Sequence, residues 1–537
     1  MMSRRGFVAS AAGAAALGQS RRGVDRLRGL MLDAARLPES PEHYRRVIDF
    51  CAEWGYNAIL FRLTDDQGCA LRFASHPELV THANALTPHE ASDLAAYGRK
   101  RGVLLIPEVE SFGHTHFITG VAKYAGLEDG DPSRNGFGGI CPVNPDAIQI
   151  VHDLYREAAR IFPAPYFHGG CDEVSWGFSE RSRQAIAAKS RAQVWADYVN
   201  SLGALVRDLG KEFIIWGDVV AHKEPEILPL IDKRIVIMDW QYYVPDADPL
   251  RRTARAILDD GRRVMGAPAM ISCKWGPRCG PDQLRNIEAF ADAYGALPDA
   301  GNLGVVITNW VPSRYLARSM WDTYAYGAVA LKGGSVDARM RAFREFPERF
   351  YGAKASPAWE AMFLRYYDAT PARRSCSNGW KGAFLPVPWT NQAELRAGAA
   401  AGIVPDFATL RREVAEAGDS VRRNAVDFSS FALSAEYIEH LYWRQHASSE
   451  TIAAIAGRDA AIVQKLEAEW NSSRPANSPG KSQALPYLGP QDQLLFRMRE
   501  AAGFSAELAR SSGRLGRVGG VRPGDDVGNT CGERAEQ

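Results

Sequence analysis

Short apolar runs rich in β-branched and aromatic residues alternate with longer amphipathic runs from Arg28 onward. The short runs have the length and composition of strands, and the longer ones have the spacing of helices with one buried face. The predicted strands are Arg28–Asp33, Asn57–Leu63, Val103–Val109, Tyr166–Asp172, Phe213–Gly217, Ile235–Gln241, Arg262–Pro268 and Gly304–Trp310. The predicted helices between them include Pro41–Trp54, Pro88–Arg101, Pro145–Phe162 and Ser182–Leu209, several of which begin with a proline, a favoured first helical residue.

Eight strand–helix units in roughly 320 residues predict an α/β fold, a (β/α)8 TIM barrel. An open, doubly wound sheet is the structural rival, but no glycine-rich phosphate loop follows the first strand. The alternation stops after about Arg344, and helical patterns such as Thr409–Val426 and Ser434–Gln445 follow. We therefore expect the barrel over residues 23–345, a mainly helical C-terminal domain over 346–512 and a disordered tail over 513–537.

The first 22 residues resemble an export signal rather than part of the fold. Arg4 and Arg5 precede the small apolar stretch Ala9–Leu17, as in signals of the twin-arginine route. No other run approaches the roughly 20 apolar residues that span a membrane. The sequence thus predicts a bacterial protein that is exported, to the periplasm in our interpretation, and that has no membrane span.

Composition narrows the range of partners. The 64 basic and 63 acidic residues nearly cancel, so neither nucleic acid nor an anionic membrane is expected as the main partner. The eight cysteines follow no metal or disulfide-scaffold spacing. Cys51 and Cys171 lie in apolar runs and are expected to be buried thiols, and only Cys273 and Cys279 are candidates for a bridge.

Two adjacent carboxylates, Asp172 and Glu173, end the apolar run that begins at Tyr166, behind a glycine pair. Charges next to a hydrophobic run are costly unless they are paired or functional. Neighbouring side chains of a strand point to opposite faces, so these two can share a pocket only where the strand ends. Barrel enzymes place their chemistry at strand C-termini, which makes this pair the leading catalytic candidate.

Four segments in barrel order resemble the glycoside hydrolase family 20 β-N-acetylhexosaminidases. They are Arg28–Arg36, Leu63–Gly68, Ile106–Thr115 and the catalytic-strand motif His168–Val174. The resemblance covers roughly residues 24–335 and implies the TIM barrel and a sugar-hydrolysing activity. Cys171 before the carboxylate pair, with Ile214–Asp218 downstream, is most similar to the hexosaminidase D-like branch.

The resemblance implies a retaining exo-hydrolase of terminal β-linked GlcNAc or GalNAc, without a cofactor or metal. In this family the substrate's own acetamido oxygen attacks the anomeric carbon and forms an oxazolinium ring. Glu173 is expected to act as general acid and then base, and Asp172 to orient the acetamido group. Glu173 should then be protonated beside a charged Asp172, because a like charge raises the pKa of a neighbouring acid.

The resemblance also implies a substrate-binding set. Arg28 should grip the 3- and 4-hydroxyls of the terminal sugar, and tryptophans at later strand ends should wall the acetamido pocket. The residues expected to support or bind the sugar are Arg28, Asp65, Asp66, Glu110, His114, His168, Trp216, Trp240, Tyr242, Trp275 and Trp310. Tyr242 and its neighbour Tyr243 are the candidates to replace the family's acetamido-binding tyrosine, which has no clear match.

Two alternatives stay open. The missing tyrosine favours a sugar-binding barrel with weak catalysis, whereas the retained Asp172–Glu173 pair favours an enzyme. Arg62 and Cys69 replace the family's histidine and tryptophan around the second-strand motif, which leaves the acid–base pair intact but leaves open the leaving-group preference and the acetamido contacts. The pair His114 and His116 has a spacing that can bind a metal, which would suit a metal-dependent amino-sugar hydrolase. The sequence does not give the sugar preference, the natural glycan or the oligomeric state.

Overall fold

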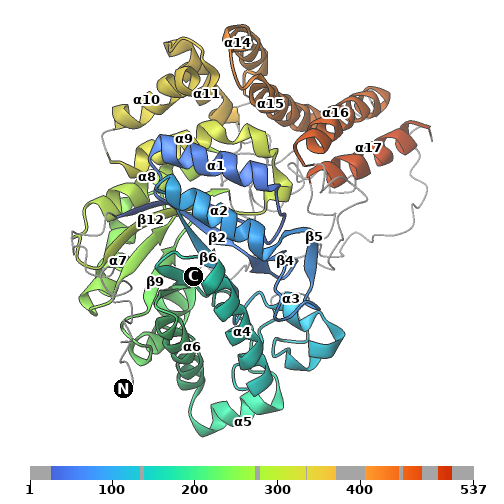
Figure 1. Cartoon of the computed structure of the whole chain (residues 1–537). Helices are drawn as coiled ribbons and strands as arrows, with labels where there is room; N and C mark the ends of the chain where they lie inside the picture. Colours follow the sequence, from blue (N-terminus) through green and yellow to red (C-terminus); the bar gives the residue numbers. More distant parts are fainter. Residues whose placement is uncertain are drawn as a thin grey trace, which may run out of the picture.

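The computed structural model describes residues 26–133, 138–271, 279–333, 336–369, 405–446, 452–474 and 494–510. Its centre is a closed barrel of eight parallel strands (Figure 1). The barrel strands are β1 (Leu27–Leu32), β2 (Ala58–Arg62), β6 (Leu104–Glu108), β7 (Tyr166–His168), β8 (Glu212–Trp216), β9 (Val236–Trp240), β10 (Val264–Ala267) and β12 (Asn302–Asn309). The first and last strands close the ring, with Leu27 opposite Gly304 and Leu30 opposite Ile307. This confirms the predicted TIM barrel, and each predicted strand contains or overlaps an observed one.

The remaining strands lie at the carboxyl ends of the barrel strands. β3 (Thr64–Asp65), β4 (Gly68–Leu71) and β5 (Thr81–Leu86) form a small separate sheet in the loop that follows β2. β11 (Ala269–Ile271) extends the edge of β12. The alternating pattern that marked the barrel strands did not reveal these short pieces.

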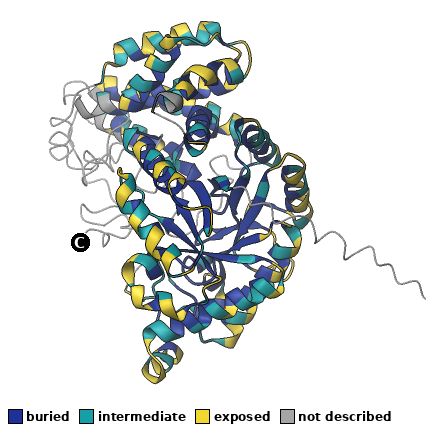
Figure 2. Cartoon of the chain, turned by 90° about the vertical axis from the view of Figure 1, so that its left-hand side faces the viewer, coloured by how far each residue is buried: buried dark blue, intermediate teal, exposed yellow. Residues whose placement is uncertain are grey.

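The helices of the barrel region surround the strands, with their buried faces inward (Figure 2). They are α1 (Pro41–Trp54), α2 (Pro88–Lys100), α3 (His116–Thr119), α4 (Pro145–Ile161), α5 (Glu180–Ala188), α6 (Arg191–Asp208), α7 (Ala247–Asp259), α8 (Pro281–Gly295) and α9 (Trp321–Leu331). Local signals start several of them. Ser40 accepts from the amide of His43 at the start of α1, and Thr87 forms a capping box with Glu90 at the start of α2.

The strands carry apolar side chains on both faces, as expected for a barrel filled by its own core. Met31, Leu60, Ile106, Met238 and Val306 belong to one cluster, drawn from alternate positions of neighbouring strands. The larger cluster joins the other strand faces to the surrounding helices. The barrel interior is therefore packed, and the space for a ligand lies at the strand ends.

The prediction of one helix over Ser182–Leu209 was wrong. The chain breaks between α5 and α6, where Ser190 has a φ of 144° and its hydroxyl accepts from the amide of Gln193. Serine competes well for this cap position because its short side chain replaces the missing backbone acceptor. The apolar periodicity continues across the break, and this continuity hid the break from sequence analysis.

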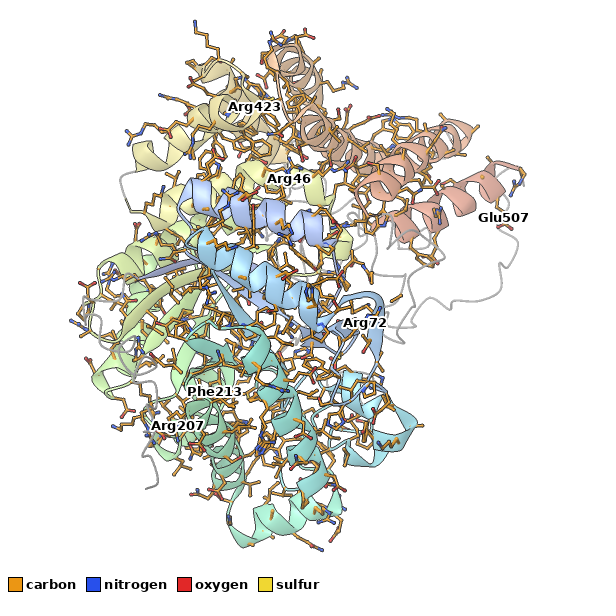
Figure 3. The ribbon with its side chains drawn as sticks, viewed as in Figure 1. Arg46, Arg72, Arg207, Phe213, Arg423 and Glu507 are labelled. Carbon is orange, nitrogen blue, oxygen red and sulfur yellow. The ribbon has the colours of Figure 1, made fainter. Side chains whose placement is uncertain are left out.

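Beyond the barrel the described chain is helical, as predicted. The helices are α10 (Val336–Phe346), α11 (Pro357–Ala369), α14 (Phe407–Ser420), α15 (Ala425–His446), α16 (Ile452–Ser473) and α17 (Leu494–Arg510). Asp427 of α15 accepts hydrogen bonds from Arg46 of α1 and from the indole of Trp321 at the start of α9. Figure 3 shows Arg46 on the side of α1 that faces these helices. The C-terminal helices are thus docked on the barrel through buried polar contacts.

Several predictions fall outside the described residues. These are the export signal over 1–22, the tail over 513–537, Trp275 and the suspected partner Cys273. The domain boundaries proposed from the sequence stay predictions. Within the part of the chain that the structure describes, every helix is too short or too polar to cross a bilayer.

Candidate functional site

The carboxylates Asp172 and Glu173 lie just beyond the end of β7, where the strand geometry breaks. The strand ends at His168, and Gly170, Cys171 and Glu173 then have φ values of 68°, 74° and 44°. This left-handed region is rare and strained for residues with a side chain, and such strain is concentrated at functional sites. The break lets the two neighbouring side chains contact the same imidazole, which an extended strand would forbid.

Gly170 shows why a glycine stands in this turn. A Cβ atom at this position would lie 1.8 Å from Oε2 of Glu110, which is fully buried at the end of the neighbouring strand. The turn therefore needs both the positive φ and the close approach that only glycine allows.

His114 links the two carboxylates to a third. Its Nε2 atom lies 3.5 Å from Oε2 of Glu173 and 3.7 Å from Oδ2 of Asp172. Its Nδ1 atom lies 3.0 Å from Oδ2 of Asp66, whose other oxygen accepts from the amide of His116. Burial opposes the charged imidazole, but Asp172, Asp65, Asp66 and Glu173 together raise the pKa of His114 well above its usual value. His114 is thus a cation beneath the carboxylate pair.

The charge balance of the unliganded pair differs from the expectation. Burial raises the pKa of Asp172, and Asp218 and Glu173 add to this rise against His114 and Arg62. Burial also acts to raise the pKa of Glu173, but His114, Lys223 and Arg36 outweigh it and lower that pKa. The pKa shifts of the unliganded site therefore run opposite to those expected from the carboxylate pair alone, and a protonated Glu173 beside a charged Asp172 stays a prediction. The like-charge argument omitted the cations that tertiary structure brings to Glu173.

A second ionic group lies under the first. Arg62, at the end of β2, is fully buried and contacts Asp65, Glu108 and Glu110. Burial raises the pKa of Glu108 to about 7, with Asp172 and Asp33 acting in the same direction and Arg62 and Trp216 opposing them. Asp65 and Glu110 are fully buried and pair with Arg62, so they support the floor of the site and their side chains are not on its surface.

The prediction that Arg28 grips the sugar was wrong. Arg28 is the second residue of β1, and its Nε donates to the carbonyl of Gly55 at the end of α1. The strand rises about 3.3 Å per residue, so Arg28 is separated from the strand's carboxyl end by roughly 13 Å. It lies at the opposite end of the barrel from the carboxylates.

Arg36, in the same sequence motif, is the arginine at the correct end. Its guanidinium pairs with Asp33 and Asp65, each 3.0 Å away, and lies 5.1 Å from the centre of the Trp310 ring. It also acts on the pKa of Glu173. The sequence offered a signal, since Arg36 follows the predicted strand where functional loops begin.

Trp240, Tyr242 and Trp310 form an aromatic group beside the carboxylates. The rings of Trp240 and Tyr242 stack at 4.9 Å, and the indole of Trp310 donates to the hydroxyl of Tyr242 at 2.9 Å. Asp172 and Glu173 both act on the pKa of Tyr242, which burial raises well above its usual value. The structure thus brings Tyr242, one of the two tyrosines considered from the sequence, to the pair.

Trp216 and His168 lie deeper than expected. Both are fully buried, with ring centres 4.5 Å apart. The indole of Trp216 donates to Glu108, and Nδ1 of His168 accepts from the amide of Gly170. Burial lowers the pKa of His168 well below its usual value, so this imidazole is neutral. These two residues support the floor and the turn rather than face the opening.

Two further residues, which sequence analysis did not select, approach Glu173. Asp218 follows β8, and its Oδ2 accepts from the amide of Glu173 at 3.1 Å and from Lys223 at 2.7 Å. Asp218 had appeared within the Ile214–Asp218 pattern, but Lys223 carried no signal because lysines on loops are common.

The metal alternative joined His114 with His116. In the described residues, the side-chain groups that could hold an ion are Asp65–Asp66–His114 and His114–Asp172–Glu173, and neither includes His116. The described groups that could hold an ion are therefore not built on the His114–His116 pair considered from the sequence.

Comparison with known proteins agrees with this geometry. Residues 26–269 match the family described as glycosyl hydrolase family 20, catalytic domain. A β-hexosaminidase of Vibrio furnissii is 25% identical over 247 residues, which cover 40% of this chain and 39% of that protein. A β-N-acetylhexosaminidase of Cellulomonas fimi is 26% identical over 259 residues, which cover 45% of this chain and 47% of that protein. The matches thus span less than half the length of these two relatives.

A solved structure has the same fold. The crystal structure of a β-N-acetylhexosaminidase superposes with a TM-score of 0.51 and 18% identity, over 62% of this chain and 78% of that one.

Proposed function

The barrel is a family 20 glycoside hydrolase catalytic domain, and from this premise we propose that the protein is a retaining exo-β-N-acetylhexosaminidase. Its substrates would be glycans with a terminal, non-reducing β-linked GlcNAc or GalNAc. The observation that carries the proposal is the pair of carboxylates, Asp172 and Glu173, held by a strained turn around one imidazole beside an aromatic wall.

In the first step, the acetamido carbonyl oxygen attacks the anomeric carbon as the bond to the leaving oxygen breaks. Glu173 gives its proton to that oxygen, and Asp172 accepts from the acetamido N–H, which becomes more acidic as the ring closes. In the second step, water attacks the anomeric carbon and gives a proton to Glu173. The oxazolinium ring opens and the sugar leaves with its original anomeric configuration.

Substrate binding would move both pKa values in the direction that this reaction needs. The side chain of Glu173 is 30% exposed, and a bound sugar would remove water from it and so raise its pKa. Asp172 has a buried Oδ1 atom without a hydrogen-bond partner, which suits the acetamido N–H. A hydrogen bond to the charged form would lower the pKa of Asp172. A bound sugar would therefore favour the protonated form of Glu173 and the charged form of Asp172.

The aromatic group would hold the acetamido arm against the anomeric carbon. Holding the two reacting groups together lowers the entropic part of the activation barrier. The hydroxyl of Tyr242 interacts with Thr308 and accepts from Trp310. A phenol hydroxyl can accept and donate at once, so with a sugar bound Tyr242 would keep the bond from Trp310 and donate to the acetamido oxygen. Arg36, which pairs with Asp33 and Asp65 beside Trp310, would hold the sugar's hydroxyls.

We also propose that the protein is exported through the twin-arginine route. Periplasmic fractionation of the unsubstituted protein and of a variant with Arg4→Lys and Arg5→Lys would test this.

The test is release of p-nitrophenol from its β-N-acetylglucosaminide and β-N-acetylgalactosaminide, with EDTA, and with a thiazoline that mimics the cyclic intermediate. We expect hydrolysis that EDTA leaves unchanged and the thiazoline blocks. Glu173→Gln should lose most activity while it still binds the thiazoline. Binding without hydrolysis in the unsubstituted protein would indicate the sugar-binding barrel instead, and inhibition by EDTA would favour a metal-dependent hydrolase.

A further inference from the structure

Asp218 and Lys223 form a pair that belongs to neither the catalytic carboxylates nor the aromatic wall. They begin and end one short π-helical segment, η2 (Asp218–Lys223), which follows β8. Irregular helical turns of this kind occur often at functional sites. Asp218 is buried, whereas the side chain of Lys223 is 48% exposed. The segment thus brings a buried anion and a solvent-facing cation together next to Glu173.

Asp218 holds the backbone of Glu173. Its Oδ2 atom accepts from the Glu173 amide at 3.1 Å, across the gap between β7 and β8. Glu173 has a φ of 44°, which for a residue with a side chain persists only where surrounding contacts enforce it. A hydrogen bond to an ionised acceptor is among the stronger ones available for this purpose.

Lys223 neutralises the same oxygen. Its Nζ atom lies 2.7 Å from Oδ2 of Asp218, so the carboxylate can lie next to Glu173 without adding an uncompensated negative charge. A lone Asp218 would oppose ionisation of Glu173, whereas the Asp218–Lys223 pair does not. The two residues therefore act together on one neighbour.

We propose that Asp218 and Lys223 are a positioning pair for the acid–base carboxyl of Glu173, fixing its backbone so that its proton reaches the departing oxygen of a poor leaving group. This inference rests on the proposed function. A general acid has to be aimed at the departing oxygen, and its proton matters most when the leaving group is a poor one. The natural leaving group of such an enzyme is a sugar alkoxide, which has to be protonated as it departs.

Other charged groups also face Glu173 and set its background. His114 reaches it from the loop after β6, and Arg36 from the loop after β1. Asp172 adjoins it in sequence, and the hydroxyl of Tyr242 lies close enough to be affected by both carboxylates. Lys223 is one of three cations that lower the pKa of Glu173, so its removal should weaken the effect without abolishing it.

The first test compares two leaving groups. Chitobiose has a sugar leaving group that must be protonated by the acid. The 2,4-dinitrophenyl β-N-acetylglucosaminide instead releases dinitrophenolate, a weak base that departs with little help from an acid. We expect Lys223→Met to lower kcat/KM for chitobiose about 10-fold and to leave the dinitrophenyl substrate within about twofold. The descending limb of the pH profile should move to higher pH, and Lys223→Arg should restore most of the loss.

Lys233→Met is the matched control. Lys233 pairs with Asp260 at 3.2 Å, has a side chain that is 62% exposed and precedes β9, at the opposite end of the barrel. It should behave as the unsubstituted protein with both substrates. Equal losses for both leaving groups in Lys223→Met, or none for either, would overturn the proposed role.

Asp218→Asn tests the other half of the pair. We expect a fall in kcat of about 10- to 100-fold with KM changed much less, because a displaced catalytic group costs rate more than binding. The melting temperature and thiazoline affinity of this variant should stay close to those of the unsubstituted protein. If Asp218→Asn does not fold, the Lys223 variants test the positioning role, because they alter an exposed side chain.

A measurement without turnover separates this inference from the proposed function. The carboxyl stretch of Glu173 can be isolated by infrared difference spectra against Glu173→Gln and titrated in the unliganded protein. It should titrate at higher pH in Lys223→Met than in Lys233→Met. If the titration of Glu173 moves in Lys223→Met but the unsubstituted protein hydrolyses no substrate, only the proposed function is contradicted. If the unsubstituted protein hydrolyses substrate but the titration of Glu173 does not move, the role of the Asp218–Lys223 pair is contradicted.

Discussion

The guanidinium of Arg36 lies over the ring of Trp310, 5.1 Å from its centre. These residues follow the first and the last barrel strands, 274 positions apart in sequence (310 − 36), and closure of the barrel brings them together. Asp33 joins them, since its Oδ2 is 3.0 Å from Arg36 and accepts from the amide of Val311. The seam of the barrel is thus fixed by polar contacts at the mouth of the candidate site.

We predict that Arg36→Met lowers kcat/KM about 10- to 100-fold, the usual cost of losing hydrogen bonds from a charged donor. Arg28→Met should stay within about twofold, because Arg28 lies at the other end of the barrel. Steady-state kinetics with p-nitrophenyl β-N-acetylglucosaminide would check both, with melting temperatures to separate unfolding from lost binding. The reverse ranking would restore Arg28 as the sugar-binding arginine.

Replacing Tyr242 by phenylalanine removes one hydroxyl and keeps the ring that stacks on Trp240. We expect kcat to fall about 100-fold, as when one preorganised donor to the reacting group is removed. Tyr97→Phe is the matched control, because the Tyr97 hydroxyl donates to Asp49 from α2, and it should change kcat no more than about twofold. Comparable losses in the two variants would contradict a specific acetamido contact of Tyr242.

Acid stability should depend on Asp65. Burial acts to raise its pKa, but Arg36, Arg62 and His114 outweigh this and lower the pKa to about 2 from the ordinary value of 3.8. A lowered folded-state pKa stabilises above the unfolded value and is lost as the pH falls through the folded value. The unsubstituted protein should therefore lose on the order of 2 kcal/mol of unfolding free energy from this group between pH 4 and 2.

Urea unfolding at several pH values would measure this dependence. The difference in stability between the unsubstituted protein and Asp65→Asn should be largest above pH 4 and should shrink toward pH 2. Asp246→Asn, at an exposed position before α7, should show no such trend. A difference that is constant with pH would contradict the ionic role of Asp65.

The docking of the C-terminal helices should depend on Asp427. This residue is buried and accepts from Arg46 and Trp321, so its loss leaves both donors without their acceptor. We expect Asp427→Ala to destabilise the protein by about 3 kcal/mol, the lower end for a broken buried ion pair because Arg46 is partly exposed. Asp419→Ala, at an exposed site on α14, should leave the melting temperature unchanged. Equal melting temperatures for the two variants would show that the interface does not need this contact.

The sequence determined the barrel and the place of its chemistry. Strand periodicity is local, so the eight strands could be found one by one, and their order and spacing left few folds to consider. The strand ends could then be named, because carboxyl ends of parallel strands meet on one face. Asp172 and Glu173 were identified in this way, as residues that an extended strand would separate.

Tertiary structure decided which charged groups act on that pair. Arg28 and Arg36 lie in one motif, but the direction of β1 puts them at opposite ends of the barrel. The lowered pKa of Glu173 depends on His114, Lys223 and Arg36, which come from three different loops. Electrostatic interactions depend on distance in space and on burial, and neither can be read from spacing along the chain.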